Sequence, residues 1–168
     1  MTMHPSAQKV ADAAQELGLD IEIVEFEQTT RTAQDAADAI GQHPSGTVCQ
    51  VAQIVKSLLF VADGQPLMAL VSGANRLDER KLAALRGVGR KKVKRADADT
   101  AKAATGFSIG GVPPFGHESN LPVYVDQDLT RFDIVWAAAG TPHAVFAIAP
   151  DDLVRASGGM VADLAADK

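Results

Sequence analysis

Short apolar runs alternate with short amphipathic segments along this chain, and the pattern predicts an α/β fold. The order of elements is mixed rather than strictly β-α-β, so we expect one α/β domain, residues 1–168, with a mixed sheet. Alternating or β-branched apolar runs predict strands at 21–26, 56–63, 66–73, 121–129, 133–140 and 144–150. Helical spacing predicts helices at 6–17, 32–40, 78–85 and 97–104, a short one at 48–54, and one beginning at 151.

Turn and cap residues refine this pattern. Gly64 and Pro66 separate the two longest apolar runs and predict a hairpin. Ser6 and Thr32 stand where N-caps of the first two helices are expected. Residues 41–47, GQHPSGT, are typical of a loop.

A lysine interrupts the most apolar stretch of the chain. Between Ile54 and Ala62 only Lys56 and Ser57 are polar. Burying an unpaired ammonium in an apolar setting costs several kcal/mol or forces the group neutral. Lys56 therefore either carries its charge to solvent on its long stem or has a function inside a pocket.

Composition adds that the chain is an ordinary globular one. Of its 168 residues, 46% are hydrophobic and 22% are charged, which suits one domain with a substantial core. The N-terminus lacks the apolar region of a signal peptide, and the apolar run 134–139 is too short to span a membrane. The single cysteine, Cys49, cannot form an internal disulfide. We expect a cytoplasmic protein with no membrane partner.

Positive charge is concentrated in one segment of an acidic chain. The formal net charge is −5, yet residues 86–95 hold six basic side chains and no acidic one. Such a patch can contact phosphates, so we predict an RNA-binding segment, with a solvated loop as the alternative. The six residues are Arg86, Arg90, Lys91, Lys92, Lys94 and Arg95.

The common motifs of metal, nucleotide and serine-hydrolase sites are missing or out of context. The four histidines and one cysteine lack zinc-ligand spacing, and no Walker A or dinucleotide motif is present, so we expect no metal and no cofactor. Residues 106–110, GFSIG, match G-x-S-x-G, and Asp126 and His143 follow Ser108 in hydrolase order. That motif requires a strand before the serine and a helix after it, and the predicted elements do not supply them.

Two loops rich in glycine and proline are candidate ligand contacts. In residues 110–116, GGVPPFG, the prolines fix φ and the glycines permit close backbone approach to a ligand. In residues 140–144, GTPHA, His143 is available as a base or a pocket wall. Each loop alone is also explained as a plain turn, and His143 as a structural residue.

Together these segments resemble the YbaK/prolyl-tRNA synthetase editing-domain family of freestanding aminoacyl-tRNA deacylases. The resemblance runs from about residue 6 to 159 and rests on VKSLLF, LVSGANRLDERKL, IGGVPPFGH, LPVYVDQDL and VWAAAGTPHAVFAIAP, in that order. It implies a single compact α/β domain with a mixed, partly barrel-like β-sheet surrounded by helices. It also implies hydrolysis of the ester that joins a wrong small amino acid, such as alanine, serine or cysteine, to a tRNA, with proline tRNA one candidate. Such editing in trans is needed because synthetase pockets discriminate weakly among small side chains.

The family's motifs place roles on matching residues. The resemblance implies catalytic roles for four residues: Lys56, Gly110, Gly111 and Pro114. It implies substrate contacts for seven: Ser57, Val112, Pro113, Gly140, Thr141, Pro142 and His143. The branch that clears alanine from proline tRNA typically has asparagine after the lysine, whereas this chain has Ser57, so the amino acid stays open.

The mechanism that the resemblance implies needs no cofactor. A positioned water attacks the activated ester with help from the tRNA's own hydroxyl, while Lys56 supports negative charge. The implied partners are a mischarged aminoacyl-tRNA and, as a further candidate, an aminoacyl-tRNA synthetase. Two alternatives stay open: a non-catalytic tRNA- or synthetase-binding module of the same fold, and a serine esterase that depends on Ser108.

Overall fold

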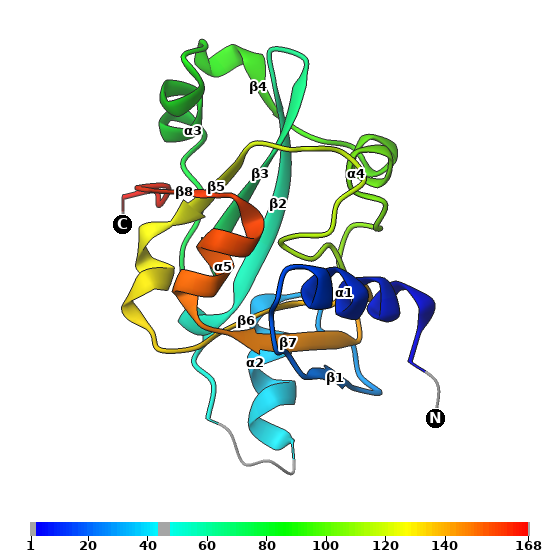
Figure 1. Ribbon diagram of the computed structural model, residues 1–168. Helices are drawn as coiled ribbons and strands as arrows, with labels where there is room; N and C mark the ends of the chain where they lie inside the picture. The colour runs from blue at the N-terminus through cyan, green and yellow to red at the C-terminus, as the bar shows by residue number, and fades with distance from the viewer. Residues whose placement is uncertain (1–2, 44–47, 168) are drawn as a thin grey trace.

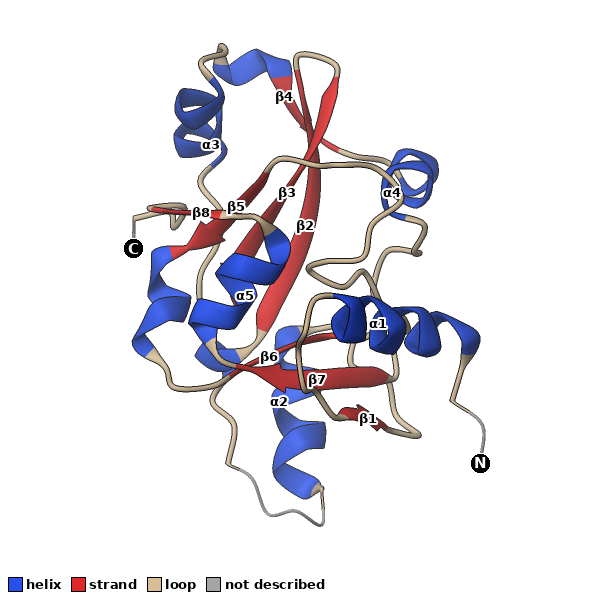
Figure 2. Cartoon of the chain, viewed as in Figure 1, coloured by secondary structure: helices blue, strands red, loops and turns tan. Residues whose placement is uncertain are grey.

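The computed structural model describes residues 3–43 and 48–167. Within them, five helices surround two sheets, which confirms the α/β expectation (Figures 1 and 2). The strands are β1 (Ile23–Glu25), β2 (Val55–Ala62), β3 (Gln65–Ser72), β4 (Val93–Arg95), β5 (Val123–Asp126), β6 (Val135–Ala138), β7 (Ala144–Ile148) and β8 (Met160–Ala162). The helices are α1 (Pro5–Glu16), α2 (Ala33–Gln42), α3 (Glu79–Arg86), α4 (Ala98–Thr105) and α5 (Pro150–Ser157). None of these helices is long and apolar enough to cross a membrane.

The larger sheet is mixed, as expected. Its order is β4-β2-β3-β5-β8, with β2 antiparallel to β3 and β4, and with β3, β5 and β8 parallel. The smaller sheet is antiparallel in the order β1-β7-β6. The two sheets meet at one bridge between Ile54 and Trp136. They curve around a shared core without closing into a barrel.

The β2–β3 hairpin is the centre of the fold. Its register runs from Val55 opposite Ser72 to Ala62 opposite Gln65. The turn itself is Asp63 and Gly64, which both have positive φ, the conformation that a tight two-residue hairpin requires. Pro66 lies within β3 rather than in the turn.

Of the two predicted N-caps, one is confirmed. Thr32 caps α2 as expected, since its side chain accepts from the N–H of Asp35 at 3.0 Å. Ser6 does not cap α1, because the helix begins one residue earlier with Pro5 and His4 is the N-cap. Proline suits the first helical position, where no N–H is needed. Of the expected loop 41–47, the first two residues extend α2 and residues 44–47 lie outside the described part.

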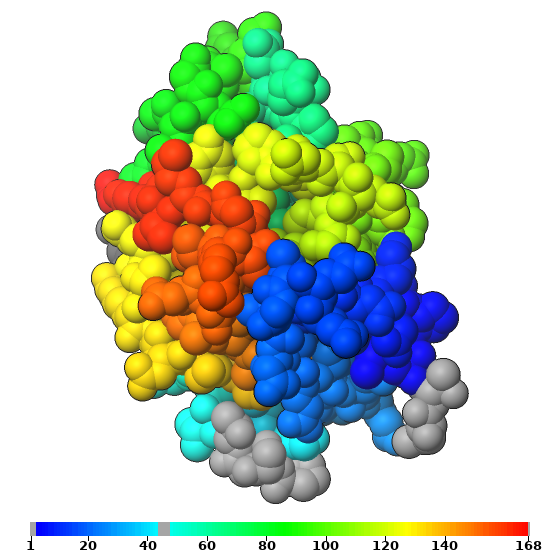
Figure 3. Space-filling model, in the orientation of Figure 1, coloured from blue at the N-terminus to red at the C-terminus, as the bar shows by residue number. Residues whose placement is uncertain are grey.

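Alternate side chains of the hairpin enter two separate cores. Leu59 and Met68 join α1, α5 and the smaller sheet on one face, where α1 and α5 meet at the surface (Figure 3). Phe60 and Val71 join α3 on the other face. Because side chains alternate along a strand, a hairpin covered on both faces reads as a continuous apolar run. Lys56, the second residue of β2, is only partly buried.

Candidate active site

Lys56 lies on the part of β2 where one strand edge is free. The other edge pairs with β3, where Val71 is opposite Lys56. On the free edge β4 pairs only with residues 60–62, and Ile54 bridges Trp136, so no described strand pairs with 55–58 there. A cavity opens at this gap.

The cavity has a volume of about 450 Å³ and mixed walls. Strand β2 contributes Lys56 and Ser57, and the glycine-proline loop contributes Gly110 and Val112. Other parts of the wall include residues 136–138 of β6 and residues 30–33 at the start of α2. Its charged lining residues are all cationic: Arg31, Lys56 and Arg95. No aspartate, glutamate, histidine or cysteine is among the described residues that line it. The cavity therefore presents positive charge but no side-chain base.

A second depression, of about 660 Å³, adjoins the first and shares Lys56, Leu58 and Arg95 with it. It is also rich in cations, with Arg76, Arg80 and Arg90 among its lining residues. Its two carboxylates are engaged: Glu79 pairs with Arg90, and Asp78 caps α3. Lys56 thus stands at the junction of a small cavity and an open cationic surface.

The Lys56 ammonium is half-buried and held by the main chain. Its Nζ donates to the main-chain oxygen of Asn75, in the loop after β3. Burial lowers the pKa of Lys56 and nearby Arg95 lowers it further, while the charge of Asp126 raises it. A cation in such partly dry surroundings interacts more strongly with an anionic group than it would in water.

The two glycine-proline loops predicted from sequence pack against each other. Gly111 O accepts from the N–H of Gly140 at 2.8 Å. A Cβ added to Gly111 would lie 2.7 Å from the main-chain nitrogen of Thr141, so the contact requires glycine. The Pro113 carbonyl lies 2.7 Å from Nε2 of His117, whose pKa is lowered by burial. Backbone packing from two sides thus fixes the loop that forms one cavity wall.

The predicted site residues divide into a lining set and a supporting set. Four of those predicted to act in catalysis or substrate contact line the cavity: Lys56, Ser57, Gly110 and Val112. Three others are buried behind that wall: Gly111, Pro113 and Pro114. The turn 140–143 supports the wall from outside, since Pro142 O accepts from Thr30 Oγ1 at 2.9 Å and His143 Nδ1 contacts Gln28 O at 3.1 Å.

Several cavity residues were not found from the sequence. Arg31 lies beside the predicted cap Thr32, and the polar run QTTRT before an alanine-rich helix was a usable signal. Trp136 lines the cavity from an ordinary-looking strand. Two buried polar atoms, Ser57 Oγ and Trp136 Nε1, have no hydrogen-bond partner among the described residues. Such groups are costly to leave unpaired.

The serine-hydrolase triad is not assembled. The buried carboxylate of Asp126 accepts from Ser72 N and Asn75 Nδ2. His143 contacts Gln28 O rather than Asp126, and Ser108 is exposed. Nor do the described residues gather three or more His, Cys, Asp or Glu side chains where a metal ion could be held.

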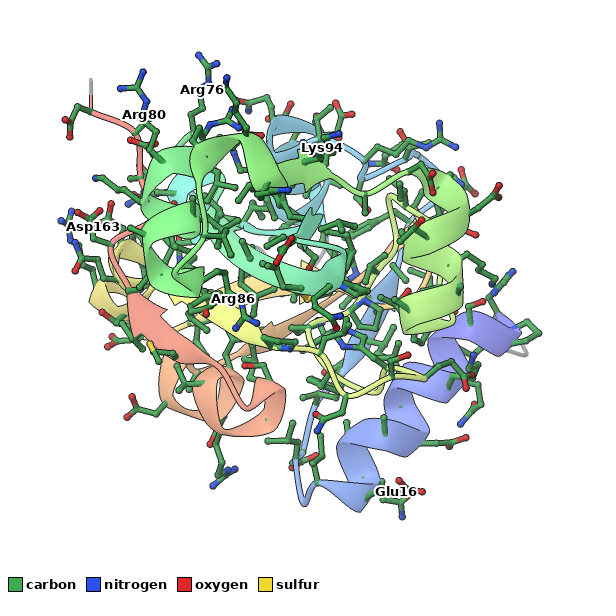
Figure 4. The ribbon with its side chains drawn as sticks, turned by 90° about the horizontal axis from the view of Figure 1, so that it is seen from above. Glu16, Arg76, Arg80, Arg86, Lys94 and Asp163 are labelled. Atoms are coloured by element: carbon green, nitrogen blue, oxygen red, sulfur yellow. The ribbon has the colours of Figure 1, made fainter. Side chains whose placement is uncertain are left out.

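The basic segment does not form one surface. Arg86 donates to Tyr124 Oη at 3.1 Å, and Figure 4 shows it across α3 from Arg76 and Arg80. Lys94 and Arg95 are consecutive in β4 and therefore point to opposite faces of the sheet. Lys91 and Lys92 are exposed in a single turn of 3₁₀ helix.

Comparison with known proteins finds relatives and solved structures that match most of the chain. Protein YwhH of Bacillus subtilis is 30% identical over 133 residues, covering 79% of this chain and 78% of the relative. An Enterococcus faecalis protein, provisionally named Cys-tRNA(Pro)/Cys-tRNA(Cys) deacylase EbsC, is 25% identical over 134 residues, 79% of this chain and 76% of its own. A crystal structure of a protein provisionally named a trans-editing enzyme for prolyl-tRNA synthetase has a TM-score of 0.89 and 42% identity, covering 99% of this chain and 100% of the other.

The sequence pattern of one family accounts for most of the chain. It is the aminoacyl-tRNA editing domain, and its match covers residues 27–156, from the segment before α2 to the end region of α5. The match includes Lys56, both glycine-proline loops and the strands that carry them. The resemblance inferred from sequence motifs is therefore confirmed, and the chain belongs to the aminoacyl-tRNA editing domain family.

Proposed function

We propose that this protein is a trans-editing hydrolase that removes a small, wrongly attached amino acid from a tRNA. The observation that carries the proposal is the cavity at Lys56, which is lined by cations and by no described side-chain base. An ester of an anionic nucleic acid suits cationic walls, and a cavity whose described lining holds no side-chain base suits a substrate that brings its own hydroxyl. The whole chain, residues 1–168, is proposed to act as this one editing domain in the cytoplasm.

The proposed reaction is water attack on the aminoacyl ester. Lys56 stabilises the negative charge that develops on the carbonyl oxygen, or holds the terminal phosphate, from a partly dry position. The free hydroxyl of the terminal ribose orients the water and accepts its proton. Gly110, Gly111 and Pro114 hold the main chain of the loop against the terminal adenosine, and the tight Gly111–Gly140 contact supplies the rigidity that positioning requires.

Small side chains at the cavity wall are proposed to select the amino acid by size. Ala137 and Ala138 of β6 and Val112 of the loop line the space beside Ser57. Alanine, serine and cysteine differ by one small group, which an apolar pocket separates by only about 1–3 kcal/mol. We therefore propose that the substrate carries one of these three amino acids, with proline tRNA as the first candidate carrier. An aminoacyl-tRNA synthetase is a candidate partner.

The tRNA phosphates are proposed to lie on the second depression. Among the residues predicted from sequence, Arg95 is best placed, since it lines both hollows. Arg76 and Arg80 join it, and none of these three has an ion-pair partner among the described residues. Arg90 is tied to Glu79, and Arg86 to Tyr124. Lys91, Lys92 and Lys94 line neither depression, and we propose that they contribute by long-range attraction.

A deacylation panel tests the proposal. Alanyl-, seryl- and cysteinyl-tRNA(Pro), with correctly charged prolyl-tRNA(Pro) as the control, are incubated with the protein and the ester remaining is measured. We expect rapid loss of at least one mischarged species and none of prolyl-tRNA. The Ser108→Ala variant is expected to act like the wild type. Salt-sensitive tRNA binding without any turnover would instead support a non-catalytic module, and loss of activity in Ser108→Ala would support an esterase.

A further inference from the structure

The position of Lys56 depends on a loop that Lys56 itself does not belong to. Its ammonium donates to the main-chain oxygen of Asn75, which is 19 residues away in the connection between β3 and α3. Because the Lys56 side chain is flexible, its position depends on the position of the Asn75 carbonyl. The contacts that hold the Asn75 loop therefore also position the Lys56 ammonium.

A buried carboxylate fixes this loop. Asp126 ends β5 and is fully buried. Its Oδ2 accepts from Ser72 N at 3.0 Å and from Asn75 Nδ2 at 2.9 Å, while its Oδ1 accepts from Asp128 N at 2.9 Å. The Asn75 amide also donates to Asp128 Oδ2 at 2.7 Å. One carboxylate thus ties together the end of β3, the Asn75 loop and the segment after β5.

The same carboxylate acts on Lys56 by its charge. Burial is the largest effect on Lys56 and favours the neutral amine, Arg95 acts in the same direction, and Asp126 opposes both. The other charged residues around the adjoining depression are Arg76, Asp78, Glu79, Arg80 and Arg90. Of the carboxylates near the site, Asp126 is the one that raises the pKa of Lys56.

We propose that Asp126 is a positioning residue of the active site, which holds Lys56 in place through Asn75 and places a negative charge that favours its ammonium form. The proposal rests on the catalytic role of Lys56 under the proposed function. It assigns the buried polar cluster a task beyond stability, because an apolar contact at this point would support the loop but supply no charge. Asp126 contacts neither cavity, so its influence passes through its neighbours.

The two parts of the proposal are separated by two variants. Asp126→Asn keeps the size of the side chain and removes its charge, so the Lys56 pKa falls and the alkaline limb of the kcat/KM profile moves to lower pH. We expect its loss of kcat/KM to be at least about threefold larger at the midpoint of the wild-type alkaline limb than at pH 6.5, after subtraction of uncatalysed hydrolysis. Asn75→Ala keeps the charge of Asp126 but frees the loop, so we expect a similar loss at both pH values.

Asp128→Asn is the matched control. Asp128 also accepts from the Asn75 amide, but its charge is not among those that shift the pKa of Lys56. We expect this variant to keep the wild-type pH profile. An unchanged alkaline limb in folded Asp126→Asn, or full activity in Asn75→Ala, overturns the proposal.

An NMR titration of the free protein distinguishes this proposal from the proposed function. With ¹³C-labelled lysine, the Lys56 resonance is assigned by its absence in Lys56→Ala. Its titration midpoint is expected to be lower in Asp126→Asn than in the wild type and unchanged in Asp128→Asn. If Lys56 proves dispensable for deacylation while this shift occurs, the proposed function fails and the electrostatic coupling stands. If Asp126→Asn does not fold, Asn75→Ala still tests the positioning arm.

Discussion

At the scale of single residues, burial lowers the pKa of two side chains, Lys56 at the cavity and His117 just after the loop 110–116. Lys56 and His117 both have lowered pKa values because desolvation disfavours their charged forms. The interaction that raises the pKa against this effect differs between them. For Lys56 it is the charge of Asp126, whereas for His117 it is the hydrogen bond to the Pro113 carbonyl. The charged form of Lys56 is therefore favoured by a full negative charge, and that of His117 only by a hydrogen bond.

His117 should make stability depend on pH. Because its folded pKa lies below the ordinary 6.5, the unfolded chain binds more protons as the pH falls below about 7. The unfolding free energy should therefore fall between pH 8 and pH 5, and His117→Gln, which can still donate to Pro113 O, should lose less. Urea unfolding of both proteins at the two pH values measures the difference. Equal pH dependence in the two proteins would show that buried His117 is not its cause.

At the scale of elements, the contact between the loop 110–116 and the turn 140–143 sets the shape of one cavity wall. Both segments were predicted from the sequence, because glycine and proline indicate where the backbone takes up special local conformations. Their mutual packing was not predictable from either segment alone, since it joins residues about 30 positions apart. The Gly111–Gly140 hydrogen bond holds the turn against the loop that lines the cavity.

Gly111→Ala should distort this wall. Its new Cβ would meet the Thr141 backbone at 2.7 Å, so the loop must move. We expect a loss of about 1–3 kcal/mol in unfolding free energy and, because the reacting groups are misplaced, about a hundredfold loss of deacylation rate. Gly89→Ala is the control, since nothing lies within 4 Å of its Cβ and its φ of −69° is ordinary. Equal behaviour of the two variants would contradict the packing argument.

The elements that sequence reasoning missed share a physical cause. Strands β4 and β8 have three residues each, and most of their side chains are exposed. Such segments carry little apolar pattern and form because a longer strand offers a free edge. By contrast, Thr32, Asp78 and Asp97 each cap the helix that follows, and a cap is a local interaction that the sequence displays directly.

At the scale of the whole molecule, the fold redistributes charge that looks concentrated in the sequence. The run of six basic residues is spread over two faces and partly neutralised, while Arg76 and Arg80, outside the run, join Arg95 at one depression. Sequence spacing cannot show this, because α3 and the neighbouring strands set which side chains face together. The motif residues of the cavity were predictable, and the cationic surface around them was not.

Neutralising Arg76 and Arg80 together should weaken the binding of different tRNAs to a similar extent, because phosphate contacts do not depend on the nucleotide sequence. Each lost phosphate contact should reduce the magnitude of the slope of log K against log salt by about 1. Filter binding or fluorescence anisotropy over a salt series measures that slope. Arg155→Gln on α5, an exposed residue paired with Asp152, serves as the control and should leave the slope unchanged. A wild-type slope in the Arg76→Gln/Arg80→Gln variant would rule out this surface.

Single-turnover deacylation by Lys56→Ala tests the central claim most directly. The enzyme is held in excess over the mischarged tRNA that the wild type hydrolyses fastest, and folding is checked by thermal melting. Since Lys56 is proposed to stabilise charge that develops only during reaction, we expect the rate to fall by about 10²–10³-fold at saturating enzyme, with the fold retained. A folded Lys56→Ala protein that deacylates at the wild-type rate would contradict the account.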